Sequence, residues 1–406
     1  MPAFVSRLDV NSDAYQKNRS EQLENIELLR QLQARAKAAS EKRRPRFEER
    51  GQLTPRDRLA RLLDVGMPFV ELFNLASYCV DDPNRETSLP GASILAGIGY
   101  ISGVRSMICV DDSGINAGAA TERGFDKLTA CIQIAISNKL PFIHLVESAG
   151  ANLMAYKIEG WAYAGRVFYS LAKASAAGVP TFTILHGPST AGGAYMPGMS
   201  DYNVGVKNNG MAALGGAALV QAATGEIADE RELGGTEMHA SVSGLMEHLA
   251  EDDADGIHKM RELVGRLGWN SHCPPTPQRE FLDPLYDKEE ILGLVPTDYK
   301  VPYDSRELIA RLVDGSDFIE FSNRFGTNLV CVHASIFGHD VALVANNGPM
   351  GPDEAAKGAH FFQTVDQANI PLIFLNNITG YMVGTEYEQA GMIKHGAKMI
   401  QAVSNI

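Results

Sequence analysis

The segment 186–198, HGPSTAGGAYMPG, combines a glycine pair with a Ser-Thr pair, and it contains no charged side chain. Glycine allows the main chain to turn sharply and to approach a ligand closely, and amides at the start of a helix carry partial positive charge. The amides of Gly192 and Gly193 are therefore candidates for an oxyanion hole, which stabilises an enolate without a side-chain acid or base. A purely structural glycine turn is the alternative, and the segment by itself leaves both interpretations open.

Other chemistries fit the chain less well. A nucleophile elbow needs G-x-S-x-G, but residues 187–191 lack the second glycine, and a P-loop would need a lysine after the glycines. His239 and His248 have no further ligand at a useful spacing, so structural roles are favoured and no metal is expected. Residues 251–262 resemble a calcium loop, yet they begin with Glu and carry His258 where an apolar residue belongs. An acidic cap on the following helix is therefore favoured.

Composition and charge narrow the class of protein. The chain has 406 residues, of which 45% are hydrophobic, and this favours two domains of an ordinary globular protein. Its net charge of −13 argues against non-specific nucleic-acid binding. No apolar run is long enough to span a bilayer, and the N-terminus lacks the apolar core of a signal peptide, so a cytoplasmic protein without membrane contact is expected. The five scattered cysteines are expected to be reduced thiols.

A short basic patch interrupts this acidic composition. Its cations are Arg35, Lys37, Lys42, Arg43, Arg44, Arg46, Arg50, Arg56, Arg58 and Arg61. Such a run is typical of a solvated helical face, although a local patch can also receive a phosphorylated ligand. Both interpretations remain open at this point.

Hydrophobic periodicity predicts alternating helices and strands. The expected elements are helices at 20–39 and 54–63, a hairpin at 98–110 with its turn at 102–103, helix 124–138, strand 142–146, helix 161–176 and strand 181–185. Strands separated by helices of this length indicate an α/β layer fold with crossover connections. The turn 147–151 also follows a strand, so we expect it to line the same pocket as the glycine pair. Glycines 97, 99 and 103 miss the dinucleotide-binding spacing and are expected in the hairpin.

Short stretches recur in the same order about 230 to 250 positions apart, which indicates an internal duplication. The runs 59–64, 69–72 and 140–145 return as 309–314, 318–321 and 370–375. The expected organisation is a helical segment at 1–50, an N-terminal domain at 51–275, a linker at 276–302 and a C-terminal domain at 303–406. The counterpart of the glycine pair would fall beyond Ile406, so we expect a truncated second copy. Residues 376–384 of that copy, like the turn 147–151, are candidates to line the pocket of the glycine pair.

Seven motifs together give the chain a family resemblance. They are ESAGANL at 147–153, TAGGAY at 190–195, AATGE at 222–226, LGG at 233–235, NNG at 346–348, NNITGYMVG at 376–384 and KHGAK at 394–398. From about residue 15 onward, the chain resembles the carboxyltransferase (β) subunit of biotin-dependent acyl-CoA carboxylases, in the methylcrotonyl-CoA and geranyl-CoA branch. Propionyl-CoA enzymes typically have Asp-x-Pro-Gly-Phe where this chain has residues 377–381, NITGY.

The resemblance implies a fold, a reaction and partners. The fold is two tandem crotonase-like α/β domains, of which the second would be truncated here. Acyl-CoA would bind the N-terminal domain of one subunit, and carboxybiotin would bind the C-terminal domain of another. Biotin would be carried on a biotin carboxylase/biotin carrier α subunit, within an ATP-dependent holoenzyme, and the chain would self-associate into a hexamer built from dimers. The reaction would move a carboxyl group from carboxybiotin to the γ-position of an α,β-unsaturated acyl-CoA.

The same resemblance implies roles for particular residues. Gly192 and Gly193 match the glycines whose amides hold the thioester enolate. The other implied acyl-CoA residues are Ala149, Gly150, Ala151, Ala191, Ala194, Tyr195 and Ala213, and the implied biotin-side residues are Asn377, Thr379, Gly380 and Tyr381. The biotin ureido nitrogen would take the substrate proton, which explains a motif without a basic side chain.

Two departures from the family pattern bear on the substrate. Many relatives have Lys-Gly-Gly where this chain has residues 115–118, INAG. Many methylcrotonyl-CoA enzymes have a bulky aromatic near Ala213, so the smaller residue here favours a longer, geranyl-like acyl chain. Two rival functions remain: a decarboxylase subunit of the glutaconyl-CoA type, which would have membrane partners, and a fragment that binds acyl-CoA without turnover.

Overall fold

The computed structural model describes residues 4–119, 121–150, 158–378 and 380–406. The chain forms two compact units, one made of Leu29–Pro275 and the other of Met1–Leu28 together with Thr276–Ile406. Each unit mixes helices and strands, so the predicted α/β class is confirmed. Within the described ranges, none of the helices has the length and the apolar character needed to cross a membrane.

The unit Leu29–Pro275 is built on one twisted sheet. Its strands are β1 (Val70–Glu71), β2 (Ile94–Ile101), β3 (Val104–Asp111), β4 (Phe142–Ser148), β5 (Thr181–Thr190), β6 (Tyr202–Val206), β7 (Met211–Ala213) and β8 (His248–Ala250). The strand order is β1-β2-β3-β4-β5-β6-β8, and β7 pairs with the end of β5. The first three strands pair antiparallel, whereas β3, β4, β5, β6 and β8 run parallel. The parallel pairing of β3 to β8 agrees with the sequence prediction, because strands joined by a crossover helix run parallel.

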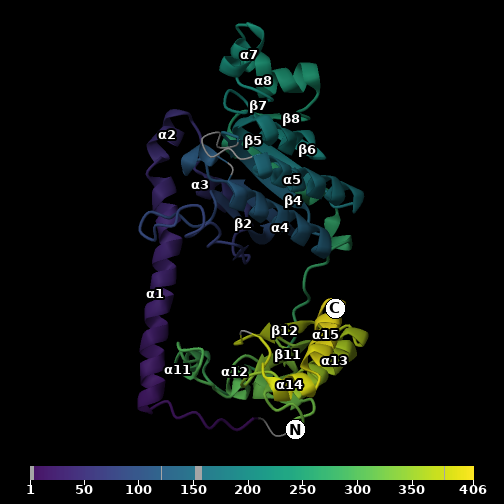
Figure 1. Cartoon of the computed structure of the whole chain (residues 1–406). Coiled ribbons are helices and arrows are strands. Elements are labelled where there is room, and N and C mark those ends of the chain that lie inside the picture. Colours follow the sequence, from purple (N-terminus) through teal and green to yellow (C-terminus); the bar gives the residue numbers. More distant parts are fainter. Residues whose placement is uncertain (1–3, 120, 151–157, 379) are drawn as a thin grey trace. The chain divides into compact units, whose positions relative to one another are not determined.

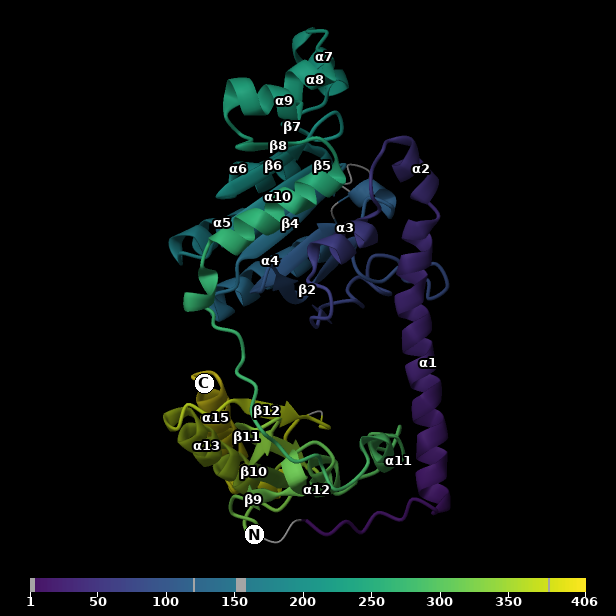
Figure 2. The ribbon, with the colours of Figure 1, turned by 180° about the vertical axis from the view of Figure 1, so that it is seen from behind.

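Helices cover both faces of this sheet. Helices α4 (Glu122–Asn138) and α5 (Ile158–Ala176) lie on one face (Figure 1), and α3 (Pro55–Leu62) and α10 (Asp253–Arg266) lie on the other (Figure 2). Side chains of β4 alternate between the two cores: Phe142 and Val146 belong to the core beside α4 and α5, and Ile143 and Leu145 to the core beside α3 and α10. The short helices of this unit are α2 (Arg44–Glu49), α6 (Tyr195–Gly198), α7 (Ala217–Thr224), α8 (Glu230–Gly234) and α9 (Thr236–Met238).

Local signals explain where the main helices begin. Helix α3 starts at Pro55, and the hydroxyl of Thr54 accepts a hydrogen bond from the Asp57 amide at 3.2 Å. The Thr121 hydroxyl caps α4 by accepting from the Gly124 amide at 3.1 Å. The helices predicted at 54–63 and 124–138 are confirmed, as are the hairpin, the strand at 142–146 and the helix at 161–176. The helix predicted at 20–39 is longer and forms α1 (Asp13–Glu41), which contributes to both units.

The glycine motif differs from the prediction in one respect. The strand expected at 181–185 continues to Thr190, so the first five residues of the motif are strand and only the remainder turns. The reason is tertiary, because β7 pairs parallel with 188–190 and extends the sheet there. Strand β6 separates β5 from β7 in the chain, so the residues around β5 give no sign that β7 pairs with it.

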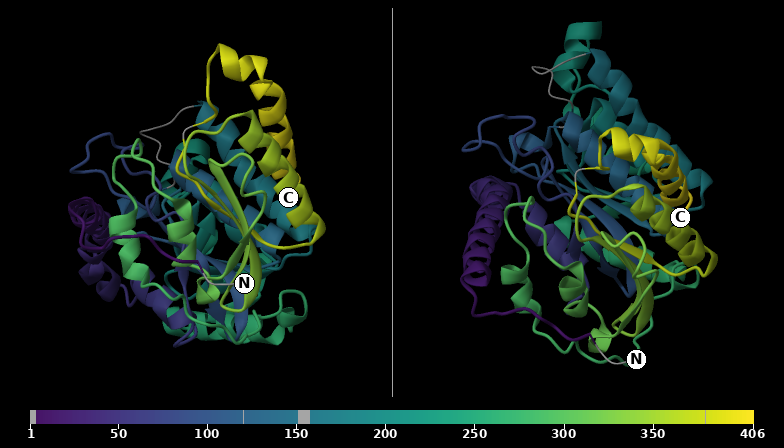
Figure 3. Two further views of the ribbon diagram at one scale, coloured as in Figure 1. Left: turned by 90° about the horizontal axis from the view of Figure 1, so that it is seen from below. Right: turned by 60° about the horizontal axis from the view of Figure 1, so that its bottom comes forward.

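The second unit repeats the same succession of elements on a smaller sheet. Its strands are β9 (Phe318–Glu320), β10 (Leu329–Ile336), β11 (His339–Asn346) and β12 (Leu372–Leu375), in the order β12-β11-β10-β9. Its helices are α11 (Ile291–Leu294), α12 (Ser305–Ala310), α13 (Pro352–Gln367), α14 (Thr385–Gln389) and α15 (Met392–Val403). Helices α13 and α15 run side by side (Figure 3). The hairpin β10–β11 is antiparallel and β12 joins β11 in parallel, as β2, β3 and β4 do in the other unit.

A matching hydrogen-bond pattern accompanies this repeated order. The Asp64 carboxylate accepts from the two amides of the hairpin turn 102–103, at 2.8 and 2.7 Å. The Asp314 carboxylate accepts from the two amides of the turn 337–338, also at 2.8 and 2.7 Å. Each aspartate closes one of the repeated stretches seen in the sequence. The repetition is therefore present in side-chain contacts as well as in the order of elements.

Candidate active site

The glycine motif turns at the carboxyl end of β5. Residues Ala191–Ala194 form a short 3₁₀ helix, and α6 follows directly. Ala191 has a left-handed backbone with φ of 52°, which sets the direction of the turn. Gly192 and Gly193 are the second and third residues of this 3₁₀ helix. Among the described residues, neither amide bonds to a group outside the turn.

Close packing explains why position 193 is glycine. A Cβ atom at Gly193 would lie 2.7 Å from Oγ of Ser189, a distance that requires one of the two groups to move. A Cβ at Gly192 would meet only Cζ of Phe168, at 3.4 Å, which is an ordinary contact. The second glycine of the pair is therefore the sterically demanding one.

Both glycines line a mostly apolar cavity of about 90 Å³ between the sheet and helices α4 and α5. Its apolar wall includes Phe125, Leu128, Val146, Val167, Phe168 and Met196. Amides that face such a wall act more strongly on a developing negative charge than amides in water do, because the surroundings screen them less. The geometry suits a thioester whose acyl chain is apolar.

A second loop forms the opposite rim of the cavity. Gly118 has φ of +68°, and a Cβ atom there would meet the Glu147 carbonyl oxygen at 2.4 Å. Ala117 is also left-handed, with φ of 54°. The Ser148 hydroxyl donates to the Gly118 carbonyl at 2.7 Å and accepts from the Gly150 amide at 3.1 Å. This rim therefore holds strained backbone in place, which is common at ligand sites.

The structure places the predicted acyl-CoA residues as follows. Gly150 lines the cavity, and the Ala149 carbonyl accepts from the Thr190 hydroxyl at 3.4 Å. Ala191 and Ala194 belong to the 3₁₀ turn, and Tyr195 is half exposed with its ring edge against Phe168. Ala213 pairs with Thr190 across β7 and β5 and is not among the cavity-lining residues. Ala151 lies outside the described residues. Ser148 lines the cavity as expected for the turn 147–151, whereas sequence reasoning missed Gly118, Ser189 and the apolar wall.

The predicted biotin-side residues follow β12 in the other unit. The Asn377 amide donates to Oδ1 of Asn346, and Nδ2 of Asn346 donates to the Asn377 carbonyl, both at 2.8 Å. Tyr381 donates from its hydroxyl to the Gly396 carbonyl at 3.4 Å, and burial raises the pKa of this phenol. Gly380 is exposed, with open space beside it, and Thr379 lies outside the described residues.

A buried ionic network lies directly behind the cavity loops. Arg58 donates from Nη1 to Oε2 of Glu147 at 2.5 Å and from Nε to Oδ2 of Asp253 at 2.8 Å. His186 donates from Nδ1 to Oδ1 of Asp253 at 2.7 Å. Arg58 is only 1% exposed, so its assignment to a surface patch of cations is wrong. The network joins α3, the end of β4, the middle of β5 and the start of α10.

Protonation in this network follows from burial and from the partners. Burial lowers the pKa of His186, because a charged ring would lose its hydration there, and the imidazole is neutral at pH 7. Burial alone would raise the pKa of Asp253, but His186 and Arg58 outweigh it and hold that pKa below its ordinary value. Arg58 is therefore the shared cation of two buried carboxylates, Glu147 and Asp253.

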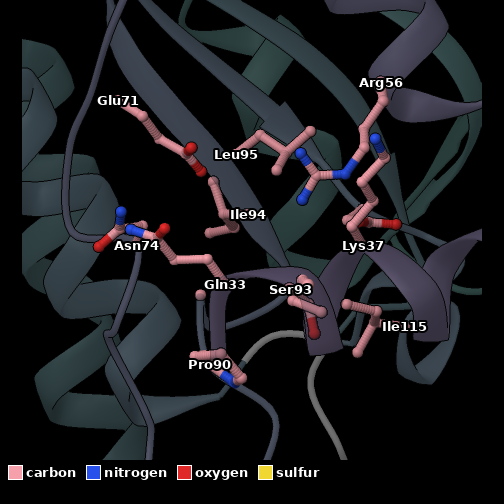
Figure 4. A pocket seen from close by; sticks show the side chains of 14 residues that line it. Gln33, Lys37, Arg56, Glu71, Asn74, Pro90, Ser93, Ile94, Leu95 and Ile115 are labelled. Carbon is pink, nitrogen blue, oxygen red and sulfur yellow. The ribbon is translucent and has the colours of Figure 1, made fainter. Parts of the chain in front are cut away.

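A second hollow of about 250 Å³ adjoins the cavity, and Ser93 and Ile94 line both. The Arg56 guanidinium extends into this hollow beside Lys37, and Glu71 stands on the opposite side (Figure 4). Nε of Arg56 is buried and has no hydrogen-bond partner in the described part of the chain. Asp112 also lines the hollow, and burial raises the pKa of its carboxyl. Two members of the basic patch thus point toward a space that a ligand can enter.

The acidic run at 251–262 caps a helix, as predicted. The Asp252 side chain accepts a hydrogen bond from the Asp255 amide at 2.8 Å, at the start of α10. The described ranges contain no group of three or more His, Cys, Asp or Glu side chains that could hold a metal ion.

Comparison with known proteins identifies the family. The family model of the carboxyl transferase domain matches residues 46–406. The biotin-dependent 3-methylcrotonyl-coenzyme A carboxylase beta1 subunit of Mycobacterium tuberculosis is 42% identical over 382 residues, which are 93% of this chain and 71% of that protein.

Solved structures agree with that match. The crystal structure of the P. aeruginosa geranyl-CoA carboxylase beta subunit has a TM-score of 0.92 at 48% identity, over 100% of this chain and 75% of that chain. A hexameric transcarboxylase 12S structure has a TM-score of 0.55 at 29% identity, over 94% of this chain and 75% of that chain. The chain therefore belongs to the carboxyl transferase family, whose members include the β subunits of biotin-dependent acyl-CoA carboxylases.

Proposed function

We propose that this chain moves a carboxyl group from carboxybiotin to an α,β-unsaturated acyl-CoA of the methylcrotonyl or geranyl type. The observation that carries the proposal is the placement of Gly192 and Gly193 on the wall of an apolar cavity. Such a site accepts an apolar acyl chain and stabilises negative charge on a thioester oxygen. The 48% identity to the geranyl-CoA carboxylase beta subunit supports a geranyl-like preference.

The chain's own groups bind and orient the acyl-CoA. Carboxybiotin, when bound, supplies the carboxyl group and a ureido nitrogen that can accept the substrate proton. The amides of Gly192 and Gly193 stabilise the charge that develops on the thioester oxygen. The apolar wall formed by α4 and α5 excludes water, and the network around Arg58 keeps both cavity loops in position.

The organisation around this site is also part of the proposal. The two units are two crotonase-like copies, which the repeated order of helices and strands supports. The first copy binds acyl-CoA, and Asn377, Thr379, Gly380 and Tyr381 of the second copy face biotin. The holoenzyme contains a biotin-carrying α subunit, and the β subunits assemble as a hexamer, as the transcarboxylase 12S does.

The test is carboxyl transfer after reconstitution with a biotin-carrying α subunit, using methylcrotonyl-CoA, geranyl-CoA and propionyl-CoA. We expect transfer to the two unsaturated substrates and little to propionyl-CoA. Equal turnover of methylcrotonyl-CoA and geranyl-CoA would remove the geranyl-like preference. Transfer to propionyl-CoA alone, or no binding of any acyl-CoA, would contradict the proposal itself.

The second hollow is suited to the phosphates of coenzyme A. Lys37 and Arg56 supply positive charge there, and the hollow shares Ser93 and Ile94 with the acyl cavity. The double variant Lys37→Ala/Arg56→Ala is expected to raise KM for acyl-CoA by about tenfold and to leave kcat nearly unchanged, because the contacts would be the same in ground and transition states. The measurement is steady-state kinetics at low and high salt, since salt screens such contacts.

Two controls accompany this variant. Lys42→Ala removes a neighbouring cation of the basic patch that does not line the hollow, so it should leave KM unchanged. An N-acetylcysteamine thioester lacks the phosphates, so the double variant should not alter its KM. An unchanged KM for acyl-CoA in the double variant would show that these cations do not bind the phosphates and belong to a solvated helical face.

A further inference from the structure

Ser189 is a buried hydroxyl beside the glycine pair. The side chain has 0% of its surface exposed, and it lines the same cavity as Gly192 and Gly193. Its Oγ atom has no hydrogen-bond partner among the described residues. It also lies 2.7 Å from the position that a Cβ atom of Gly193 would occupy, so it sits directly against the 3₁₀ turn.

Other hydroxyls of the same sheet are satisfied. The Ser148 hydroxyl, across from Ser189 on β4, donates to the Gly118 carbonyl at 2.7 Å. The Ser106 hydroxyl is equally buried on β3 and donates to the Val104 carbonyl at 3.1 Å. A buried polar group without a partner is destabilising, so it is rare unless a ligand or water completes its bonding.

A nucleophilic role does not suit this serine. The histidine on the cavity wall, His144, is opposite Thr183 in the register of β4 and β5, whereas Ser189 is opposite Ser148. Nε2 of His144 is already paired with Asp111 at 3.0 Å. No base therefore stands next to the Ser189 hydroxyl among the described cavity residues, but the hydroxyl can still donate a hydrogen bond.

We propose that Ser189 donates a hydrogen bond from Oγ to the thioester carbonyl oxygen of the acyl-CoA, as a third donor beside the two glycine amides. This inference rests on the proposed function, because it takes the thioester to be the ligand of the cavity. It assigns a side chain to a site that otherwise consists of main-chain amides. The bond completes the hydroxyl's unmet hydrogen bonding and fixes the carbonyl against the 3₁₀ turn.

The test compares two ligands that differ only in the carbonyl group. The full chain is titrated with 3-methylcrotonyl-CoA and with the corresponding 3-methylbut-2-enyl thioether of CoA, which has no carbonyl oxygen. Ser189→Ala is expected to weaken thioester binding by about 2- to 10-fold, the usual range for one hydrogen bond, and to leave thioether binding unchanged. The matched control Ser106→Ala should change neither affinity.

Thermal unfolding separates this role from a structural one. Ser189→Ala should have a Tm no lower than the parent chain, because the deleted hydroxyl has no partner to lose among the described residues. A lower Tm together with equal weakening of both ligands would show that the hydroxyl is structural and would overturn the inference. Unchanged thioester binding in Ser189→Ala would also overturn it and leave the proposed function intact. Failure of the parent chain to bind either CoA ligand would instead count against the proposed function.

Discussion

Replacing Gly193 by alanine is expected to lower kcat for carboxyl transfer by about 10²- to 10³-fold, the usual loss when one oxyanion donor is displaced. The added methyl would lie 2.7 Å from Oγ of Ser189. Ser189 is held in β5 between β4 and β7, so the 3₁₀ turn has to shift and its amides move away from the thioester oxygen. The measurement is transfer from carboxybiotin in the reconstituted enzyme.

The adjacent variant Gly192→Ala is the matched control. Its methyl would meet only the end of the Phe168 ring, at 3.4 Å, so the turn can stay in place. We expect it to raise KM by partly filling the cavity and to reduce kcat much less than Gly193→Ala does. Neither position has a left-handed φ, so both variants should fold, which circular dichroism and Tm can check. If both variants kept kcat within about threefold of the parent, the glycine amides would not be the oxyanion donors that we propose.

Replacing Arg58 by methionine is expected to lower the free energy of unfolding by about 3–5 kcal/mol, the usual loss when one partner of a buried ion pair is removed. Methionine fills much of the space but leaves the carboxylates of Glu147 and Asp253 buried without their cation. Urea denaturation of the parent chain and the variant provides the measurement. Because the network joins the end of β4 to β5, the two strands that lead into the cavity loops, activity should fall as well.

The control is an arginine in a partly exposed ion pair. Arg123 pairs with Asp126 at 2.6 Å on the surface of α4, where solvent weakens the interaction, so Arg123→Met should change stability little. The triple variant Arg58→Met/Glu147→Gln/Asp253→Asn removes the charges together and should recover part of the loss. A loss below about 1 kcal/mol in Arg58→Met would mean that water enters the site and hydrates the carboxylates.

Several parts of the fold could be predicted from local sequence. Thr54-Pro55 starts α3, Ser102-Gly103 turns the hairpin, and alternating apolar runs mark β4 and α4, because caps, turns and periodicity depend on residues close together in the chain. The repeated stretches likewise anticipated the repeated order of strands in the two units. The seven motifs led to the carboxyl transferase family, which the comparisons confirm.

The site itself depended on contacts between distant residues. Arg58 looked like one cation of a surface patch, yet it meets Glu147 and Asp253, which are 89 and 195 positions away. The strand that lengthens β5 to Thr190 is β7, and the cavity wall comes from α4 and α5. The residues near Arg58 or near β5 in the chain give no sign of these long-range contacts.

What the sequence by itself determined about this protein is its family, its alternating elements, its repetition and the glycine pair with the main-chain chemistry that it offers. Only the tertiary structure decided that Arg58 is buried, that the Ser189 hydroxyl has no partner in the described part of the chain and that the glycines line an apolar cavity. The physical reason is that burial, ion pairing and cavity shape arise where several segments meet, whereas caps and periodicity act within one segment.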